Sequence, residues 1–172
     1  ILIGHGVTDP VTFHPSVTAN ATATINELSG GRAFIGIGAG GAFGKTMKPQ
    51  PLRDLREAVE FFKKYTSGEE AEWKGARMHS EWIRRPLPVY LASSGPKSLQ
   101  MMGELSDVIS GIILVSDANL TVNKWRMELI EKGALKAGVD PSKIDAWVRG
   151  MIYITDSKEA AKREVSGYAV NS

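Results

Sequence analysis

Residues 33–41 read Ala-Phe-Ile-Gly-Ile-Gly-Ala-Gly-Gly, an apolar run that passes directly into a glycine-rich loop. A short apolar run of this kind is typical of a parallel strand that is buried on both faces. Four of the six residues 36–41 are glycines, which is more than close packing between strands requires. In parallel α/β proteins, ligands bind at the carboxyl ends of the strands. The stretch therefore predicts a buried strand followed by a ligand-binding loop.

Strand and helix patterns alternate along the rest of the chain. Besides 33–38, strand patterns cover 1–7, 87–92, 108–115 and 146–155, and helical patterns cover 15–29, 52–65, 96–105, 120–137 and 156–168. The first helix is indicated by Val17, Ala21, Ile25 and Leu28, because these residues recur at helical spacing. Regular alternation predicts an α/β fold with a parallel sheet in one domain over residues 1–172, either an open sheet or part of a barrel.

The composition excludes several classes of protein. Lys and Arg (21) nearly balance Asp and Glu (19), and no block of like charge stands out, so we expect no nucleic-acid or membrane-surface partner. The chain has no cysteine, which rules out disulfides and thiol catalysis within it, and its three histidines show no metal-ligand spacing. No apolar run reaches the length of a membrane span. A cytoplasmic protein that acts on a small molecule, without a metal, is the expectation.

Two nucleotide-binding motifs compete for the glycine-rich loop. Gly36, Gly38 and Gly41 match the spacing of a dinucleotide-binding loop, and residues 39–46 resemble a P-loop that ends in Gly44-Lys45-Thr46. Both motifs require the loop to open a helix directly, so that backbone N–H groups converge on phosphates. The prolines at 49 and 51 argue against such an early helix. A P-loop nucleotide hydrolase that uses Gly44, Lys45 and Thr46 stays as the alternative function.

Five short motifs occur in an order and spacing that resemble a known family. They are Gly6-Val7-Thr8-Asp9-Pro10, His14-Pro15, Leu28-Ser29-Gly30-Gly31-Arg32, Gly36-Ile37-Gly38-Ala39-Gly40-Gly41 and Ser93-Ser94-Gly95-Pro96-Lys97. From residue 1 to about 155, the chain is similar to the luciferase-like flavin oxidoreductases, which include methylenetetrahydromethanopterin reductases that use coenzyme F420. The resemblance implies a (β/α)8 TIM barrel, in which the five strands are numbers three to seven. We therefore expect an incomplete barrel, truncated at both ends.

The resemblance also implies a cofactor site for FMN or coenzyme F420, in an enzyme that oxidises, reduces or oxygenates a small organic substrate. The implied contacts are a non-prolyl cis peptide between Gly6 and Val7 beside Thr8, the loop Gly38-Ala39-Gly40-Gly41, and Ser93-Ser94-Gly95 as a phosphate anchor. An ordinary trans strand end and simple helix capping by Ser93 or Ser94 are the competing interpretations. Relatives that oxidise sugar phosphates carry an acidic residue at Gly41, so their chemistry is not implied, and no catalytic residue is assigned.

Two further expectations concern surfaces. The polar and aromatic segment 67–85 has no clear period, and it is either a lid over the substrate, as the resemblance suggests, or a surface excursion packed by its own tryptophans. An incomplete barrel exposes sheet edges and apolar surface, and the family is commonly dimeric. We therefore expect a homo-oligomer, and in particular a dimer.

Overall fold

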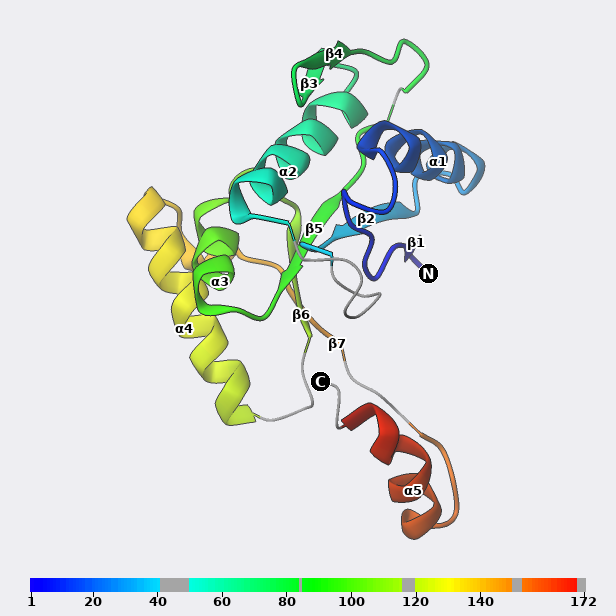
Figure 1. The fold of residues 1–172 in the computed structure, drawn as a ribbon, viewed down its shortest axis with the longest axis vertical. Coiled ribbons are helices and arrows are strands. Elements are labelled where there is room, and N and C mark those ends of the chain that lie inside the picture. Colours follow the sequence, from blue (N-terminus) through cyan, green and yellow to red (C-terminus); the bar gives the residue numbers. More distant parts are fainter. Residues whose placement is uncertain (41–49, 84, 116–119, 150–152, 170–172) are drawn as a thin grey trace.

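A computed structural model describes residues 1–40, 50–83, 85–115, 120–149 and 153–169. Within these residues, a parallel sheet has the strand order β1-β2-β5-β6-β7, and each of its strands leads into a helix (Figure 1). The strands are β1 (Ile3–Gly4), β2 (Ala33–Ile37), β5 (Val89–Ser93), β6 (Gly111–Val115) and β7 (Ala146–Arg149). The helices that follow them are α1 (Pro15–Leu28), α2 (Leu52–Thr66), α3 (Pro96–Glu104), α4 (Leu120–Ala137) and α5 (Lys158–Ala169), with a 3-10 turn at Pro141–Lys143.

The sheet is strongly curled. Phe34 on β2 and Trp147 on β7 have ring centroids 5.2 Å apart, although β5 and β6 lie between their strands. In a flat sheet, strands three positions apart would be separated by about 14 Å. Tyr90 on β5 joins this cluster, with its ring centroid 4.1 Å from that of Trp147 and 5.6 Å from that of Phe34. The five strands therefore form part of a barrel wall, and aromatic rings fill its concave side.

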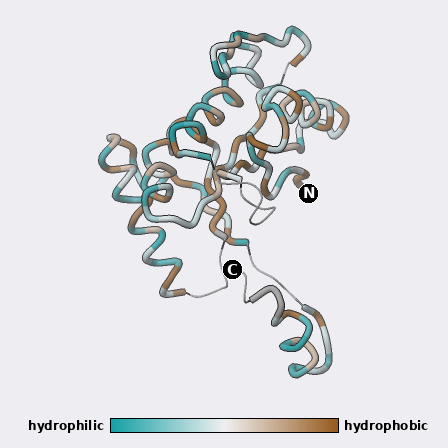
Figure 2. Tube along the Cα trace, in the orientation of Figure 1, coloured by the Kyte–Doolittle hydropathy of each residue, from teal (hydrophilic) through white to brown (hydrophobic). Residues whose placement is uncertain are grey.

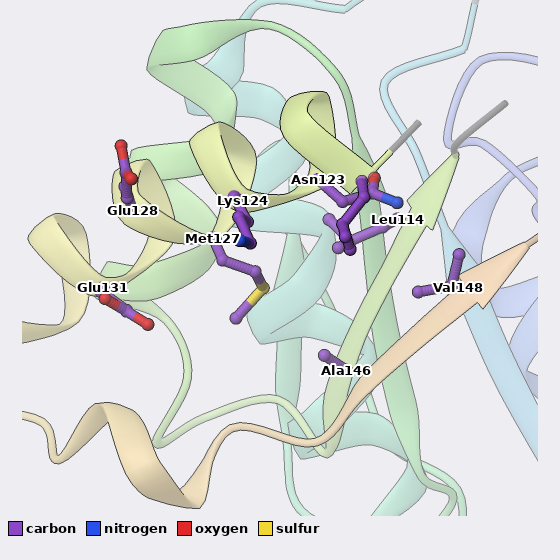
Figure 3. A pocket seen from close by; sticks show the side chains of 9 residues that line it. Leu114, Asn123, Lys124, Met127, Glu128, Glu131, Ala146 and Val148 are labelled. Atoms are coloured by element: carbon purple, nitrogen blue, oxygen red, sulfur yellow. The ribbon is translucent and has the colours of Figure 1, made fainter. Parts of the chain in front are cut away.

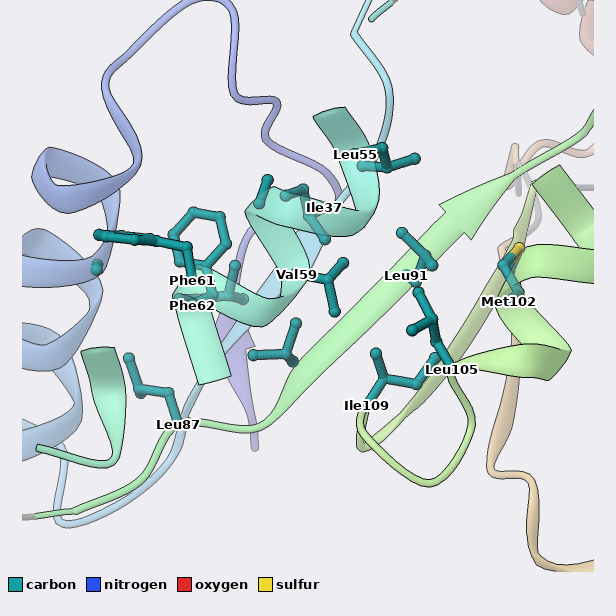
Figure 4. Close-up of a cluster of buried hydrophobic side chains, with 14 of the residues drawn as sticks. Ile37, Leu55, Val59, Phe61, Phe62, Leu87, Leu91, Met102, Leu105 and Ile109 are labelled. Atoms are coloured by element: carbon teal, nitrogen blue, oxygen red, sulfur yellow. The ribbon is translucent and has the colours of Figure 1, made fainter. Parts of the chain in front are cut away.

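The main hydrophobic core lies between the convex side of the sheet and the helices. Ile35, Ile37 and Leu91 point into it from β2 and β5, whereas Phe34 points to the concave side, as the two-residue period of a strand requires. Leu55, Val59 and Phe62 of α2 pack against these strand residues (Figure 4). Figure 2 shows the hydrophobic central strands enclosed by more hydrophilic helices. The two-sided burial of residues 33–38 expected from the sequence is confirmed.

Helices α3 and α4 approach each other at backbone distance. A Cβ added to Gly103 would collide with the carbonyl oxygen of Ile130, and one added to Gly133 would collide with that of Gln100. Glu104, at the end of α3, receives Lys136 Nζ of α4 at 2.9 Å and Arg56 Nη2 of α2 at 2.6 Å. Hydrogen bonds from Lys136 and then Arg56 hold the pKa of Glu104 below its usual value. One carboxylate thus links three consecutive helices.

The buried face of α1 is not the face that carries its larger apolar residues. Val17, Ile25 and Leu28 are 56%, 44% and 81% exposed. Small and polar side chains instead face the sheet and α2, and they are Thr18, Ala19, Thr22, Ala23 and Asn26. Small residues allow the helix backbone to approach β2 closely, so the larger apolar residues remain outside. The stripe of larger apolar residues therefore predicts the helix correctly, but it does not mark the buried face.

Segment 67–85 contains an element that the sequence did not reveal, a hairpin of β3 (Ala71–Trp73) and β4 (Ala76–Met78). Its buried Trp73 packs on Phe61 of α2, and Lys74 Nζ lies 3.2 Å from Asp54 Oδ2 at the first turn of α2. The segment joins the end of α2 to the start of β5, and Figure 1 places the hairpin at the opposite end of the molecule from the ends of β6 and β7. The packing of Trp73 on Phe61 is the contact expected of a surface excursion held by its own tryptophans.

An apolar groove lies on the convex side between α4 and the last two strands (Figure 3). Leu114, Ala146 and Val148 line it from β6 and β7, and Met127 and Asn123 line it from α4. Helix α5 stands apart from the other helices beyond the ends of the strands (Figure 1). Over the described residues, no helix has both the length and the apolar character that crossing a membrane requires.

Candidate functional site

The carboxyl end of β1 carries a bulge at the position where the sequence predicts a cis peptide. Gly4 pairs with Phe34 and Thr8 pairs with Ile37, so three residues of one strand face two of the other. The peptide bond between Gly6 and Val7, inside this bulge, is cis, which confirms the expected geometry and excludes the trans strand end. Gly6 is exposed, and a Cβ placed on it would meet no described atom within 4 Å. The bulge therefore presents bare backbone to open space.

The loop after β2 begins beside this bulge. The amide of Gly38 donates a hydrogen bond of 2.9 Å to Thr8 O, and the amide of Thr8 donates one of 2.8 Å to Gly36 O. A Cβ on Gly38 would lie 3.2 Å from Val7 Cγ2 and 3.5 Å from Ala92 O. Gly38 is thus in contact with the bulge on one side and with the end of β5 on the other. The structure brings together the three segments that the sequence predicts for the site.

The predicted loop continues through Ala39 and Gly40, which are half-buried. Gly40 has a φ of +83°, in the left-handed region that favours glycine. Gly41, the last of the predicted loop residues, lies outside the described residues, as do Gly44, Lys45 and Thr46 of the P-loop alternative. Helix α2, which follows this segment, begins at Leu52.

The third segment, Ser93-Ser94-Gly95, leads from β5 into α3. The hydroxyls of Ser93 and Ser98 share a short hydrogen bond, and Ser98 Oγ also donates to Gly95 O at 2.8 Å. Gly95 is the N-cap residue of α3, and among the described atoms no side chain caps the helix. Capping by Ser93 or Ser94, the competing interpretation, is therefore not observed. Ser94 is exposed beside backbone amides at the positive end of the helix dipole.

Two histidines lie near this edge. His14 is the N-cap residue of α1, where its Nδ1 accepts a hydrogen bond of 3.2 Å from the amide of Ser16. His5 precedes the cis bond, and burial lowers the pKa of its imidazole. Its Nδ1 is buried without a hydrogen-bond partner among the described atoms. A neutral imidazole at this position is expected near pH 7.

The geometry suits a flat, partly anionic ligand. The exposed bulge at Gly6–Val7 leaves room for an aromatic ring to approach its backbone, and the absence of a side chain at Gly38 lets the loop lie close to this bulge. The start of α3 offers uncapped amides and an exposed hydroxyl for a phosphate or carboxylate. These residues therefore fit a ring with an anionic tail. The groove of Figure 3 lies elsewhere, on the outer side of the sheet, and its lining is apolar.

Known proteins resemble this chain in sequence and in fold. The 5,10-methylenetetrahydromethanopterin reductase of Archaeoglobus fulgidus is 33% identical over an alignment of 172 residues. The alignment covers 94% of this chain and 50% of the relative. The structure of the coenzyme F420 dependent tetrahydromethanopterin reductase from Methanopyrus kandleri matches with a TM-score of 0.75 and 28% identity, over 92% of this chain and 52% of that one. The chain spans about half the length of the relatives it matches.

A monooxygenase structure from Streptomyces bottropensis shares the fold, with a TM-score of 0.70 at 22% identity over 99% of this chain and 55% of that one. The curled parallel sheet is thus an incomplete barrel of this type. None of these relatives supports a nucleotide hydrolase. The model of the luciferase-like monooxygenases matches residues 1–171. The chain belongs to the luciferase-like monooxygenase family, and its relatives include F420-dependent oxidoreductases.

Proposed function

We propose that this chain carries the cofactor-binding edge of an oxidoreductase that uses coenzyme F420, with FMN as the second candidate, to act on a small organic molecule. The observation that carries the proposal is the meeting of three segments around Gly38, with the exposed Gly6–Val7 bulge on one side and the end of β5 on the other. F420 is the first choice because the relatives above 25% identity include F420-dependent reductases.

Each segment has a part in holding the cofactor. The exposed bulge supports one face of the ring, and the small residues 38–40 let the loop backbone lie close to the bulge and to the ring or its tail. The uncapped amides of α3 and the Ser94 hydroxyl bind an anionic group of the tail. When bound, the deazaflavin or flavin supplies two-electron redox chemistry, and the protein contributes orientation and electrostatics. A proton donor is not assigned within this chain.

Fluorescence titration with F420, FMN and ATP with Mg²⁺, each alone, tests the proposal. We expect saturable binding of F420 or FMN. Binding of ATP with Mg²⁺, together with no binding of either cofactor, would establish the nucleotide-hydrolase alternative instead.

A charge substitution makes the test specific to the start of α3. Ser94→Asp places a negative charge beside the helix N-terminus, which stabilises the helix by about 0.3–1 kcal/mol but repels an anionic tail. We expect F420 binding to weaken by about tenfold, the equivalent of about 1.4 kcal/mol. Ser157→Asp is the matched control, because Ser157 Oγ accepts the amide of Ala160 at the start of α5. If Ser94→Asp binds the cofactor as tightly as the wild type, the anionic tail does not bind at the start of α3.

We also infer that the whole protein pairs with a second copy through the outer face of α1. This face exposes Val17, Ile25 and Leu28, and Glu27 is the one charged residue of the helix, whereas α2 carries charges in every turn. Depletion of charge around exposed apolar residues is typical of the centre of an interface. In sedimentation velocity, Leu28→Lys should dissociate the dimer, and Leu135→Lys on the exposed side of α4 should not. A dimer that survives Leu28→Lys would contradict this interface.

A further inference from the structure

Asp9 follows directly on the paired residue Thr8, and its carboxylate holds the next turn of the chain. Oδ1 accepts hydrogen bonds from the amides of Val11 at 2.9 Å and Thr12 at 2.8 Å, and the Thr12 hydroxyl lies 3.0 Å from Oδ1 and 3.1 Å from Oδ2. An aspartate that accepts from the amide two residues ahead makes a tight local turn. The side chain therefore fixes the shape of residues 9–12.

This turn forms a wall against the glycine-rich loop. A Cβ on Gly40 would lie 3.3 Å from Asp9 Cγ and 3.2 Å from Val11 Cγ2, so the turn occupies the space beside the Cα of Gly40. On the other side of the loop, the amide of Gln50 donates a hydrogen bond of 2.7 Å to Ala39 O. Ala39 and Gly40 are thus held between the Asp9 turn and the residue that precedes Pro51.

We propose that Asp9 is a positioning residue for cofactor binding, because its turn sets where Gly40 and the adjoining loop backbone lie. The inference rests on the proposed function, since the loop is the part that would approach the cofactor. Asp9 acts through Gly40 and is given no contact with the cofactor itself. Asp9 belongs to the motif Gly6-Val7-Thr8-Asp9-Pro10, and the motif alone implies no role for it. An aspartate often accepts a hydrogen bond from the amide two residues ahead, so its presence here was the sequence signal for a turn.

The carboxylate acts by geometry, and its charge has the opposite effect on binding. A negative charge near an anionic cofactor weakens binding, so removing the charge of Asp9 would by electrostatics alone tighten it. If the turn is what matters, its loss weakens cofactor binding. In Asp9→Ala the amides of Val11 and Thr12 lose their acceptor, and Gly40 loses its wall. These residues are half-buried and lie outside the main core, so the substitution should leave the global fold in place.

The experiment compares three variants by F420 fluorescence titration and thermal unfolding. Asp9→Ala should weaken F420 binding by about tenfold or more. Asp9→Asn should bind within about threefold of the wild type, because its amide oxygen can accept the same two N–H groups. Asp140→Ala is the matched control, since Asp140 Oδ1 makes a similar turn with Ser142 at 3.0 and 2.8 Å but lies before β7, at the amino end of the sheet. It should bind F420 as the wild type does.

Hydrogen exchange without cofactor provides a second readout. Asp9→Ala should exchange the amides of Val11 and Thr12, and that of Gln50, which donates to Ala39 O in the loop, at least about tenfold faster than the wild type, whereas Asp140→Ala should leave them unchanged. Equal F420 affinity in Asp9→Ala and the wild type would overturn the proposal, and so would unchanged exchange at Gln50. Equal weakening by Asp9→Asn and Asp9→Ala would also overturn it, because asparagine keeps the acceptor of the turn. A wild type that binds neither F420 nor FMN would overturn the proposed function, and exchange at Gln50 would still decide whether Asp9 positions the loop.

Discussion

Gly103 on α3 lies where the backbone of α4 comes closest, so a methyl group added there meets main-chain atoms. Besides colliding with the carbonyl oxygen of Ile130, a Cβ at this position would lie 2.7 Å from the amide nitrogen of Ala134. Non-bonded heavy atoms normally sit about 3.5–4.0 Å apart, and the contact with the Ile130 oxygen is the closer of the two, so the two helices would have to separate by more than about 1 Å. Helix backbone cannot rotate away as a side chain can. Gly103→Ala should therefore loosen the packing of α3 against α4.

Two opposing effects set the size of the change. Alanine is the better helix former by about 1 kcal/mol, which taken alone would stabilise the variant. Overpacking a core contact costs about 1–3 kcal/mol, and the upper end applies because the colliding atoms are main-chain atoms. The expected net loss is about 2 kcal/mol, which lowers the Tm of a domain of this size by roughly 4–8 °C.

Thermal unfolding followed by circular dichroism, at one fixed protein concentration, measures this loss. Lys132→Ala on the exposed side of α4 is the control, and it should change stability by less than about 0.5 kcal/mol. Gly133→Ala should destabilise for the same reason, and the double variant should cost less than the sum of the two, because the first substitution already separates the helices. A Tm of Gly103→Ala at or above that of the wild type would refute the reasoning.

Two further predictions concern titrating groups. Glu104→Gln should lower stability at pH 7 by about 0.5–1 kcal/mol through its weakened contacts with Arg56 and Lys136. Because the folded-state pKa of Glu104 is depressed, its contribution is present above the ordinary value of 4.5 and is lost as the pH falls below it, so urea unfolding curves of the two proteins should converge in acid. Tyr90 has a pKa raised above 10.0, first by burial and then by the charge and hydrogen bond of Asp145. Tyr90→Phe should remove the most alkaline step of the tyrosinate absorbance titration, and a titration identical to that of the wild type would contradict this assignment. Since the neutral phenol is the form that the fold favours, the stabilising contribution of Tyr90 should be present below pH 10 and lost as the pH rises through its folded pKa.

Local patterns in the sequence were sufficient for the order of elements and for the approximate place of the site. Each βα unit carries its own period and its own glycine or proline boundaries, so its existence can be predicted without knowing its neighbours. The carboxyl ends of parallel strands share one edge of a sheet. The loops at 38–41 and 93–95 could therefore be placed together once the strands were identified. The cis bond at Gly6–Val7 followed from the family resemblance rather than from any local period.

Contacts between distant segments were decided by the tertiary structure. The period of α1 predicts a helix correctly, but which face of the helix is buried depends on how close its neighbours come. In the structure the small residues face the core, and the bulky Val17, Ile25 and Leu28 are exposed. The two strands of the hairpin in segment 67–85 are too short for a two-residue period to be recognised in the sequence. The hairpin packs on α2 through the contact of Trp73 with Phe61, which the sequence of the segment does not show. Propensity and periodicity describe a segment alone, and the burial of a side chain is a property of the partner that covers it.

The sequence by itself therefore determined an α/β chain of five βα units with a glycine-rich loop at a strand end, because hydrophobic period and turn chemistry are local. Tertiary structure decided that the sheet curls until Phe34 and Trp147 meet, that Gly103 and Gly133 set the spacing of two helices, and that the Asp9 turn supports Gly40. These contacts join residues that are 27 or more positions apart, and their distances follow from how the backbone closes on itself. A pattern along the sequence does not contain these distances between distant segments.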